Sequence, residues 1–199
     1  SPVVAISGEK DGIAADIVFL MTEDGEENII GFTNNITNPE GGTHVTGFKS
    51  AFAKLINNYA RNELGALKEK DSNLTGADIR SGMQAIISVK HPDPQFEGQT
   101  KTKLSNTDVS KAVDDIVKEQ LTVYFDRNYD VLKDIVDRAV ALSKRKALEK
   151  SKININKFSF EGNGKLAKQE SSDSSKCEIF IVEGDSAGGS AKTARNRKY

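Results

Sequence analysis

The sequence predicts an α+β domain followed by the opening strand and helix of an α/β domain. Alternating apolar residues mark strands in the first half of the chain, and apolar stripes at helical spacing mark helices among and after them. A continuous apolar run near the end precedes a Gly-rich turn, as at the start of a parallel sheet. With 199 residues, the chain has room for one domain and part of a second.

Two strands are expected near the start of the chain, joined as a hairpin. Apolar residues alternate from Ala15 to Met21, and a second apolar segment runs from Ile29 to Thr33. Asp24 and Gly25 lie between them, and glycine accepts the positive φ that tight hairpin turns need. Residues 34–42, which are polar and rich in glycine, predict a loop.

One helix is expected next, and two more follow a third strand. The apolar residues of the first helix fall on one face, at Phe48, Phe52, Leu55, Ile56 and Tyr59. The strand covers residues 85–89 and ends before Pro92, because proline cannot donate to a sheet ladder. Residues 95–104 are polar without a clear period and predict a long exposed loop. Two further apolar stripes, over 109–124 and 132–140, predict helices that break at Asn128.

The composition changes after residue 150. Residues 151–176 are rich in Lys, Asn and Ser and predict a linker, which gives the expected division 1–150, 151–176 and 177–199. A short strand is expected over residues 178–182, then Glu183, then a Gly-rich turn into a helix. One strand and one helix cannot close a sheet, so we expect a second domain that is truncated. The absence of an initial Met and the abrupt end also suggest a piece of a longer protein.

Composition excludes several classes of protein. The single cysteine and two histidines rule out an internal disulfide and argue against a zinc site, and they fit a reducing cytoplasm. The formal net charge of -1 means that any contact with nucleic acid must come from local patches. No apolar run approaches the roughly 20 residues that span a bilayer, and no signal peptide is seen, so no membrane partner is expected. His44 follows a Gly-Gly-Thr turn, and a local hydrogen bond is expected for its ring.

Glu183 is the strongest candidate for a ligand-binding or metal-binding residue, because of its position in the sequence. The carboxyl end of a parallel strand, before a helix N-terminus, is where open α/β sheets bind ligands. A carboxylate there can hold Mg²⁺, which prefers oxygen ligands. The alternative is that Glu183 and Asp185 only cap the following helix, and the residues alone favour neither reading.

Three motifs resemble one protein family. Residues 182–192, Val-Glu-Gly-Asp-Ser-Ala-Gly-Gly-Ser-Ala-Lys, are similar to the signature that opens the TOPRIM domain of bacterial type II DNA topoisomerase B subunits. Residues 39–48 and 95–104 resemble the transducer domain of the same subunits, and the order and spacing of all three match. Residues 92–95, Pro-Asp-Pro-Gln, are more similar to the gyrase branch than to the topoisomerase IV branch, which stays the alternative.

The resemblance implies a ribosomal-protein-like transducer domain over residues 1–150, with a mixed sheet, packed helices and a long C-terminal helix. It implies a truncated TOPRIM beginning over residues 177–199, and an ATP-binding GHKL domain that precedes Ser1. The implied function is to couple ATP binding and hydrolysis to DNA strand passage and supercoiling. The resemblance implies that the full-length enzyme uses ATP and Mg²⁺. Its implied partners are double-stranded DNA and the A subunit, in an A2B2 assembly. The fragment alone is expected to be inactive.

The resemblance also assigns roles to individual residues. Lys101 is expected to contact the γ-phosphate of ATP with the help of Gln99, and Glu183 to act in strand cleavage as the first Mg²⁺ carboxylate of a site that continues beyond Tyr199. A basic cluster is expected to face DNA phosphates, formed by Lys192, Arg195 and Arg197. Without the resemblance, Lys101 and the cluster would be ordinary solvated charges, and the chain could be a stand-alone binding module without catalysis.

Overall fold

The computed structural model describes residues 1–157, 170, 171 and 173–196. The chain divides into two units, Ser1–Lys146 and Ala147–Tyr199, which are described separately below. Across the described residues, no helix combines the length and the apolar character that crossing a membrane requires.

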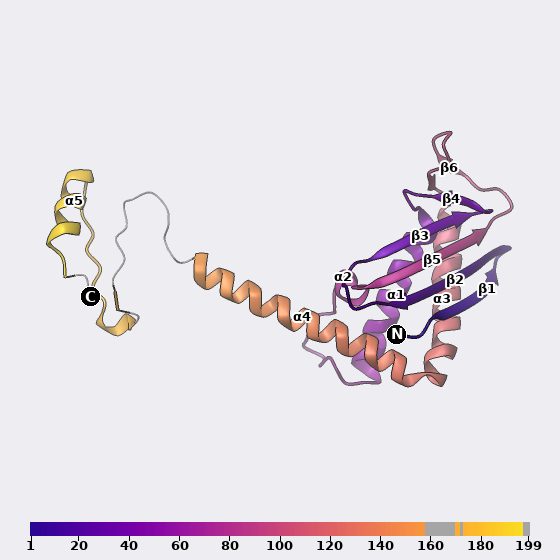
Figure 1. Cartoon of the computed structure of the whole chain (residues 1–199), viewed down its shortest axis with the longest axis horizontal. Helices are drawn as coiled ribbons and strands as arrows, with labels where there is room; N and C mark the ends of the chain where they lie inside the picture. Colours follow the sequence, from indigo (N-terminus) through magenta and orange to yellow (C-terminus); the bar gives the residue numbers. More distant parts are fainter. Residues whose placement is uncertain (158–169, 172, 197–199) are drawn as a thin grey trace. The chain divides into compact units, whose positions relative to one another are not determined.

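The first unit is built on a five-stranded mixed sheet (Figure 1). Its strands in chain order are β1 Val4–Lys10, β2 Ile13–Met21, β3 Asn28–Thr33, β4 Ile36–Asn38 and β5 Met83–Lys90. The order across the sheet is β1-β2-β5-β3-β4. All neighbours are antiparallel except β3 and β5, which are parallel and therefore need a crossover between them.

The predicted hairpin between β2 and β3 is wrong, because β5 lies between these two strands. Ile87 of β5 is paired with Ile17 on one side and with Gly31 on the other. The amide of Thr22 donates to the carbonyl of Gly82 at 2.7 Å, so the end of β2 is bonded to the start of β5 rather than to β3.

Two other turns form the hairpins of the sheet. Asp11 and Gly12, with φ of 51° and 77°, join β1 to β2, and Asn34 and Asn35, with φ of 48° and 66°, join β3 to β4. Paired positive φ values in a two-residue loop match the right-handed twist of the strands. The segment 34–42, predicted as a loop, therefore contains the strand β4.

The predicted helices are confirmed. They are α1 Thr43–Asn62, α3 Thr107–Arg127 and α4 Tyr129–Lys157, and a short helix, α2 Gly76–Ile79, forms in addition. Asn128 ends α3, as predicted from the sequence. α1 and α3 pack on each other and cover the same face of the sheet (Figure 1). α1 lies in the connection from β3 to β5 and belongs to the crossover that their parallel pairing requires.

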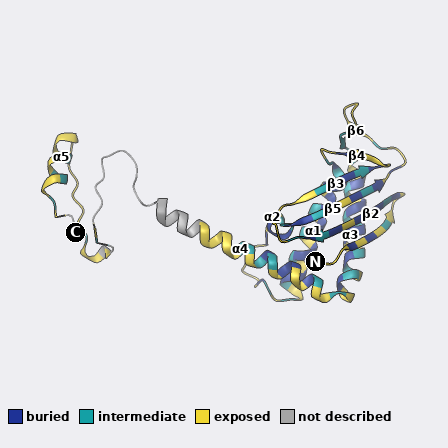
Figure 2. Ribbon diagram, in the orientation of Figure 1, coloured by how far each residue is buried: buried dark blue, intermediate teal, exposed yellow. Residues whose placement is uncertain are grey.

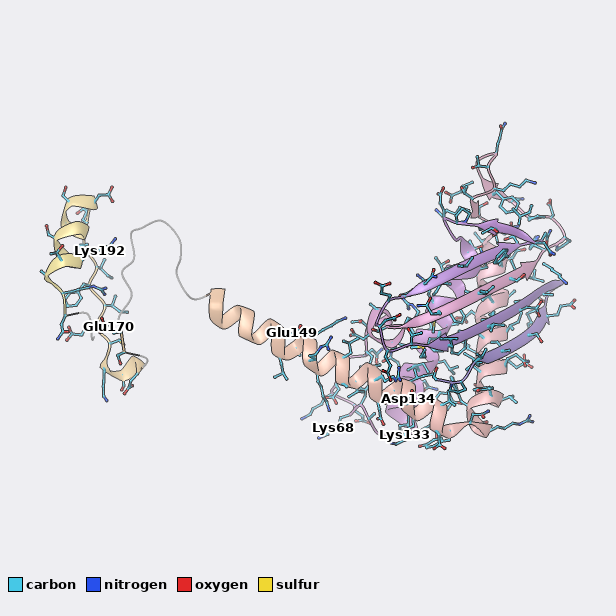
Figure 3. All side chains as sticks on the ribbon, viewed as in Figure 1. Lys68, Lys133, Asp134, Glu149, Glu170 and Lys192 are labelled. Carbon is cyan, nitrogen blue, oxygen red and sulfur yellow. The ribbon has the colours of Figure 1, made fainter. Side chains whose placement is uncertain are left out.

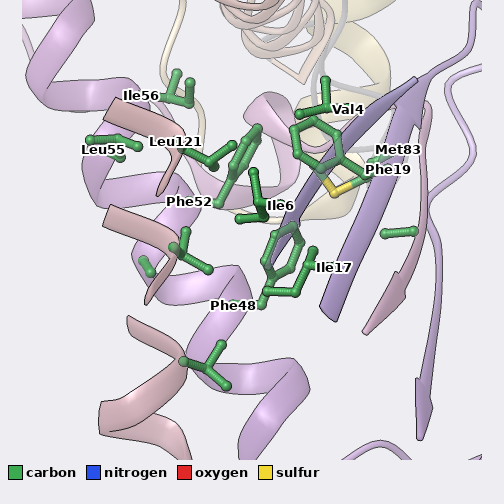
Figure 4. Close-up of a cluster of buried hydrophobic side chains, with 14 of the residues drawn as sticks. Val4, Ile6, Ile17, Phe19, Phe48, Phe52, Leu55, Ile56, Met83 and Leu121 are labelled. Carbon is green, nitrogen blue, oxygen red and sulfur yellow. The ribbon is translucent and has the colours of Figure 1, made fainter. Parts of the chain in front are cut away.

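The core lies between this helix pair and the sheet. Alternate residues of β2 and β5 point into it, while the residues between them are exposed or half-buried (Figure 2). Phe19 of β2 meets Phe52 of α1 edge-on with ring centres 5.3 Å apart, and Phe48 stacks on Phe52 at 5.6 Å (Figure 4). Full burial of one such side chain stabilises the fold by about 2 kcal/mol, so these rings fix how α1 sits on the sheet.

The second unit contains little of the α/β opening that the sequence predicted. Its elements besides the end of α4 are a 3₁₀ turn, Ser174–Lys176, and α5 Asp185–Ala194. The strand expected over residues 178–182 is absent, and Ile179 and Ile181 are 89% and 93% exposed. A single strand has no hydrogen-bond partner here, because the described residues of this unit include no second strand. The linker expected from residue 151 begins within α4, and residues 158–169 and 172 lie outside the described part of the chain.

Candidate functional site

The loop over residues 95–104 connects β5 to α3 and lies next to β4, at the edge of the sheet (Figure 1). It contains a two-stranded ladder, β6 Phe96–Glu97 and β7 Lys103–Leu104, so the prediction of a loop without secondary structure was only partly right. In this ladder Phe96 is opposite Leu104 and Glu97 is opposite Lys103. The residues at the tip, 98–101, are exposed.

Asn106 closes the base of the loop. Its Oδ1 accepts a hydrogen bond from the amide of Gln95 at 2.6 Å, and the amide of Ser105 donates to the carbonyl of Gln95 at 2.9 Å. Asn106 is the residue before α3, but its side chain bonds the loop and does not cap the helix. The two ends of the loop are therefore held together next to the rigid start of α3.

His91 anchors the segment that leads from β5 into the loop. Its backbone exchanges two hydrogen bonds of 2.9 Å with the side chain of Asn34 in the β3–β4 turn. Its Nδ1 accepts from the amide of Asp93 at 3.0 Å, so the other nitrogen, Nε2, carries the proton and faces Asp108 at 3.1 Å. The hydrogen bond from His91 lowers the pKa of the Asp108 carboxyl. This pair ties the end of β5 to the first turn of α3.

The two lysines of the loop have different surroundings. Lys103 pairs with Glu97 across the ladder at 2.9 Å. The Nζ atom of Lys101 lies 5.8 Å from the centre of the Phe96 ring, on its face. A cation–π contact attracts the charge without using directed N–H bonds, so Lys101 carries the ammonium better suited to an incoming anion. Gln99 lies two residues away on the same exposed tip.

A second segment, residues 38–42, forms hydrogen bonds with the loop. The side chain of Asn38 donates to the carbonyl of Lys101 at 2.8 Å. The amide of Glu40 donates to the Thr102 carbonyl and the amide of Leu104 to the Gly41 carbonyl, both at 3.1 Å. The structure thus brings together the motifs at 39–48 and 95–104, which are far apart in the sequence.

Gly42 is needed at this contact. Its φ is 141°, and a Cβ built on it would lie 2.4 Å from the carbonyl oxygen of Leu104. No other residue type can approach β7 this closely, because a side chain would overlap the backbone. The Gly-rich turn noted in the sequence therefore serves close packing against the loop.

His44 differs from its prediction. It is fully buried at the start of α1, and neither ring nitrogen has a hydrogen-bond partner, so the expected local hydrogen bond is wrong. Burial lowers the pKa of its imidazole to about 4. The ring is therefore neutral at pH 7, and it packs against Gly31 of β3.

The other predicted site residues belong to the second unit. Glu183 is exposed and follows no strand, and Gly184, with φ of 82°, is the residue before α5. Lys192 lies on α5 (Figure 3) and Arg195 directly follows the helix, while Arg197 lies outside the described residues. In the described parts of the chain, no group of three His, Cys, Asp or Glu side chains could hold a metal ion. The described residues alone therefore do not fit an Mg²⁺ site.

Comparison with known proteins gives the family. Residues 1–154 match the family described as DNA gyrase B. The type 2 topoisomerase B subunit of Aquifex aeolicus is 48% identical over 202 residues, which cover 99% of this chain and 25% of that protein. The DNA gyrase B subunit of Clostridium acetobutylicum is 47% identical over 202 residues, which cover 98% of this chain and 32% of that protein. The chain thus spans about a quarter to a third of the length of these curated relatives.

The fold is also similar to part of a solved domain. The 43K ATPase domain of Thermus thermophilus gyrase B, crystallised with an aminocoumarin, is 34% identical with a TM-score of 0.69, and the match covers 76% of this chain and 41% of that one. These matches place the chain among the B subunits of type II DNA topoisomerases. The chain belongs to the DNA gyrase B family, which confirms the resemblance to type II topoisomerase B subunits but not the assignment to transducer and TOPRIM domains.

The same comparisons correct the expected fold class. The solved structure that this chain resembles is an ATPase domain, whereas we expected a separate ribosomal-protein-like transducer domain followed by the start of a TOPRIM domain. The expectation that the ATPase domain lies outside the chain is therefore also wrong. The TOPRIM-like motif at 182–192 lies beyond the matched residues 1–154, and its strand does not form.

Proposed function

We propose that this chain is part of the B subunit of an ATP-dependent type II DNA topoisomerase, of the gyrase type, that couples ATP binding and hydrolysis to DNA strand passage and supercoiling. One observation carries the proposal: the loop 95–104 presents Gln99 and Lys101 on an exposed tip whose base is tightly anchored. Membership of the gyrase B family supports the reaction.

In this proposal Lys101 contacts the γ-phosphate of ATP and Gln99 helps to hold it. A lysine ammonium is a compact point charge suited to phosphate, and the contact with Phe96 keeps it near the tip until an anion arrives. A cation at the transferring phosphoryl group stabilises the charge that develops there. The residues described here bind and orient; ATP itself supplies the reactive phosphoryl group.

The anchoring of the loop provides the coupling. The lysine contact would exist before hydrolysis and be lost with the γ-phosphate, so the loop interacts differently with the two nucleotide states. His91 and Asn106 tie the loop to β5 and α3, and these elements belong to the core of the first unit. A movement of the tip, caused by gain or loss of the contact with the γ-phosphate, would therefore also move β5 and α3.

The remaining roles are proposed on the family alone. Double-stranded DNA and the A subunit, in an A2B2 assembly in the cytoplasm, are the partners. Glu183 is proposed as a carboxylate for Mg²⁺ in strand cleavage, together with ligands beyond the described residues. Lys192, Arg195 and Arg197 are proposed to contact DNA phosphates. Residues 151–176 are proposed to connect the parts of the chain before and after them.

The test is ATP turnover by a B subunit of full family length that carries this sequence. We expect Lys101→Ala to lower turnover by about 100-fold while nucleotide binding is largely kept, because a transition-state contact is lost. Lys103→Ala is the matched control: it removes a lysine from the same loop that is already paired with Glu97, and it should change turnover by less than about twofold. Unchanged turnover in Lys101→Ala would refute the proposal.

The 199 residues alone are proposed to have no ATPase activity. Lys101 and Gln99 lie on an exposed loop and would meet only one end of a nucleotide. Measurable turnover by the purified chain, abolished by Lys101→Ala, would contradict this part of the proposal.

A further inference from the structure

We propose that Asn38 is a positioning residue for Lys101: a buried amide that fixes the backbone of the lysine and thereby the direction of its side chain. The inference rests on the proposed function of Lys101. Asn38 is the last residue of β4 and is 1% exposed, although the strand before it is at the surface. A buried amide of this kind requires partners for both of its polar atoms.

Both atoms of the Asn38 amide have a partner. Nδ2 donates to the carbonyl of Lys101 at 2.8 Å. Oδ1 accepts from the hydroxyl of Thr33 at 2.7 Å, and Thr33 is itself fully buried in β3. The result is a chain of side-chain hydrogen bonds that begins in the sheet and ends on the backbone of Lys101.

The chemistry of the contact selects an amide. The Lys101 carbonyl can only accept, so the atom facing it must be the amide nitrogen, and the oxygen then faces Thr33. A carboxylate at position 38 would place oxygen against oxygen. An apolar side chain of the same shape would leave the Lys101 carbonyl and the Thr33 hydroxyl without these partners.

Lys101 is the residue of the loop that most needs such support. Its φ is 55°, a left-handed conformation that residues with a Cβ adopt only when their surroundings hold them there. The neighbouring bonds involve other residues, namely Glu40 with Thr102 and Gly41 with Leu104. Removal of the Asn38 amide should therefore leave the loop docked on residues 40–42 and release the peptide plane of Lys101 alone.

The experiment is a double-mutant cycle on ATP turnover in the full-length B subunit. We expect Asn38→Ala to lower kcat by about tenfold with little change in nucleotide affinity, because the ammonium spends less time in its productive position. Thr33→Val, which keeps shape and removes the hydroxyl, should give a smaller fall of about threefold. Thr37→Ala, on the exposed neighbour in β4, is the matched control and should match wild type.

The cycle separates positioning from general damage to the fold. In a Lys101→Ala background, Asn38→Ala should cause no further loss, since there is no ammonium left to position. The inference is overturned if Asn38→Ala alone has no effect, or if it lowers turnover equally with and without Lys101. The single variant Lys101→Ala tests the proposed function by itself. If that variant turns over ATP like wild type, the proposed function and the role of Asn38 both fail; if only the cycle is additive, the role of Asn38 alone fails.

Discussion

The imidazole of His44 occupies the space that a side chain at Gly31 would need. A Cβ built on Gly31 would lie 2.2 Å from Nε2 of His44 and 3.0 Å from its Cε1. The first turn of α1 can therefore pack directly on β3 only because residue 31 is glycine. This contact holds β3 in place, and β3 in turn carries Thr33, the first member of the hydrogen-bond chain to Lys101.

Gly31→Ala should destabilise the chain by about 3 kcal/mol, because the added methyl group forces His44 or the strand out of its position. Urea unfolding followed by circular dichroism measures the change. Gly12→Asn is the control: nothing lies within 4 Å of a Cβ there, and asparagine tolerates its positive φ. Equal midpoints for Gly31→Ala and wild type would show that β3 and α1 are less closely packed than described.

The free energy of unfolding should fall as the pH is lowered below the usual pKa of a histidine side chain. Burial lowers the pKa of His44 to about 4, below its usual 6.5, so the unfolded chain binds a proton that the folded chain excludes. The stabilising effect is fully present above pH 6.5 and is lost as the pH falls toward 4. Between about pH 7.5 and about pH 5 the loss should be about 2 kcal/mol.

A non-titrating variant isolates this effect. The free energy of unfolding of His44→Gln should depend less on pH than that of wild type in the same interval, whatever its absolute value. If wild type and His44→Gln lose equal stability over that interval, the ring is not held neutral by burial.

Leu121 should contribute far more to the free energy of unfolding than Val123, two residues away on α3. Leu121 is fully buried in the core shared with α1, whereas Val123 is 46% exposed. Leu121→Ala should cost about 3 kcal/mol of unfolding free energy, for lost burial and the cavity left behind. Val123→Ala should cost less than about 0.5 kcal/mol. A comparable loss from both would mean that α3 packs with a different face toward the sheet.

Arg61 at the end of α1 should control the order of the segment that follows. Its guanidinium donates to the backbone carbonyls of Lys68, Glu69 and Asp71 and to the side chain of Asn73. Lysine cannot reproduce this fork of donors, so Arg61→Lys should speed amide exchange over residues 67–74 by about tenfold. Hydrogen–deuterium exchange measures it, with Arg127→Lys as an exposed control on α3. Unchanged protection would assign the order of this segment to Leu67 and Leu74 instead.

Sequence periodicity predicted the helices and the interior strands well, because each buries one face and leaves the other exposed. Pairing was harder to predict. Asp24–Gly25 and Asp11–Gly12 offer the same turn signal, and only the second makes a hairpin, since the partner of β2 beyond that turn is β5, far along the chain. Local sequence does not encode which distant strand will insert between two neighbours.

In the candidate site, too, local features could be predicted from the sequence and long-range contacts could not. The exposed tip with Gln99 and Lys101 was identified from a motif, but nothing local marks Asn38 as its support. The bond from Asn38 to Lys101 spans 63 residues and becomes visible only when β4 and the loop are folded together. The strand predicted over residues 178–182 was wrong because its local signal was clear but its partner was missing. Its apolar composition is typical of a strand, but a strand forms only beside another strand.

The insertion of β5 between β2 and β3 has a consequence for how the polypeptide folds during synthesis. The β1–β2 and β3–β4 hairpins can each form as soon as their own residues leave the ribosome. They cannot join each other, because the strand that unites them is made only with residues 83–90. Until then the backbone groups on the facing edges of β2 and β3 have no strand partner, a state prone to wrong association, and the time needed to synthesise residues 39–90 sets how long the nascent chain stays in it.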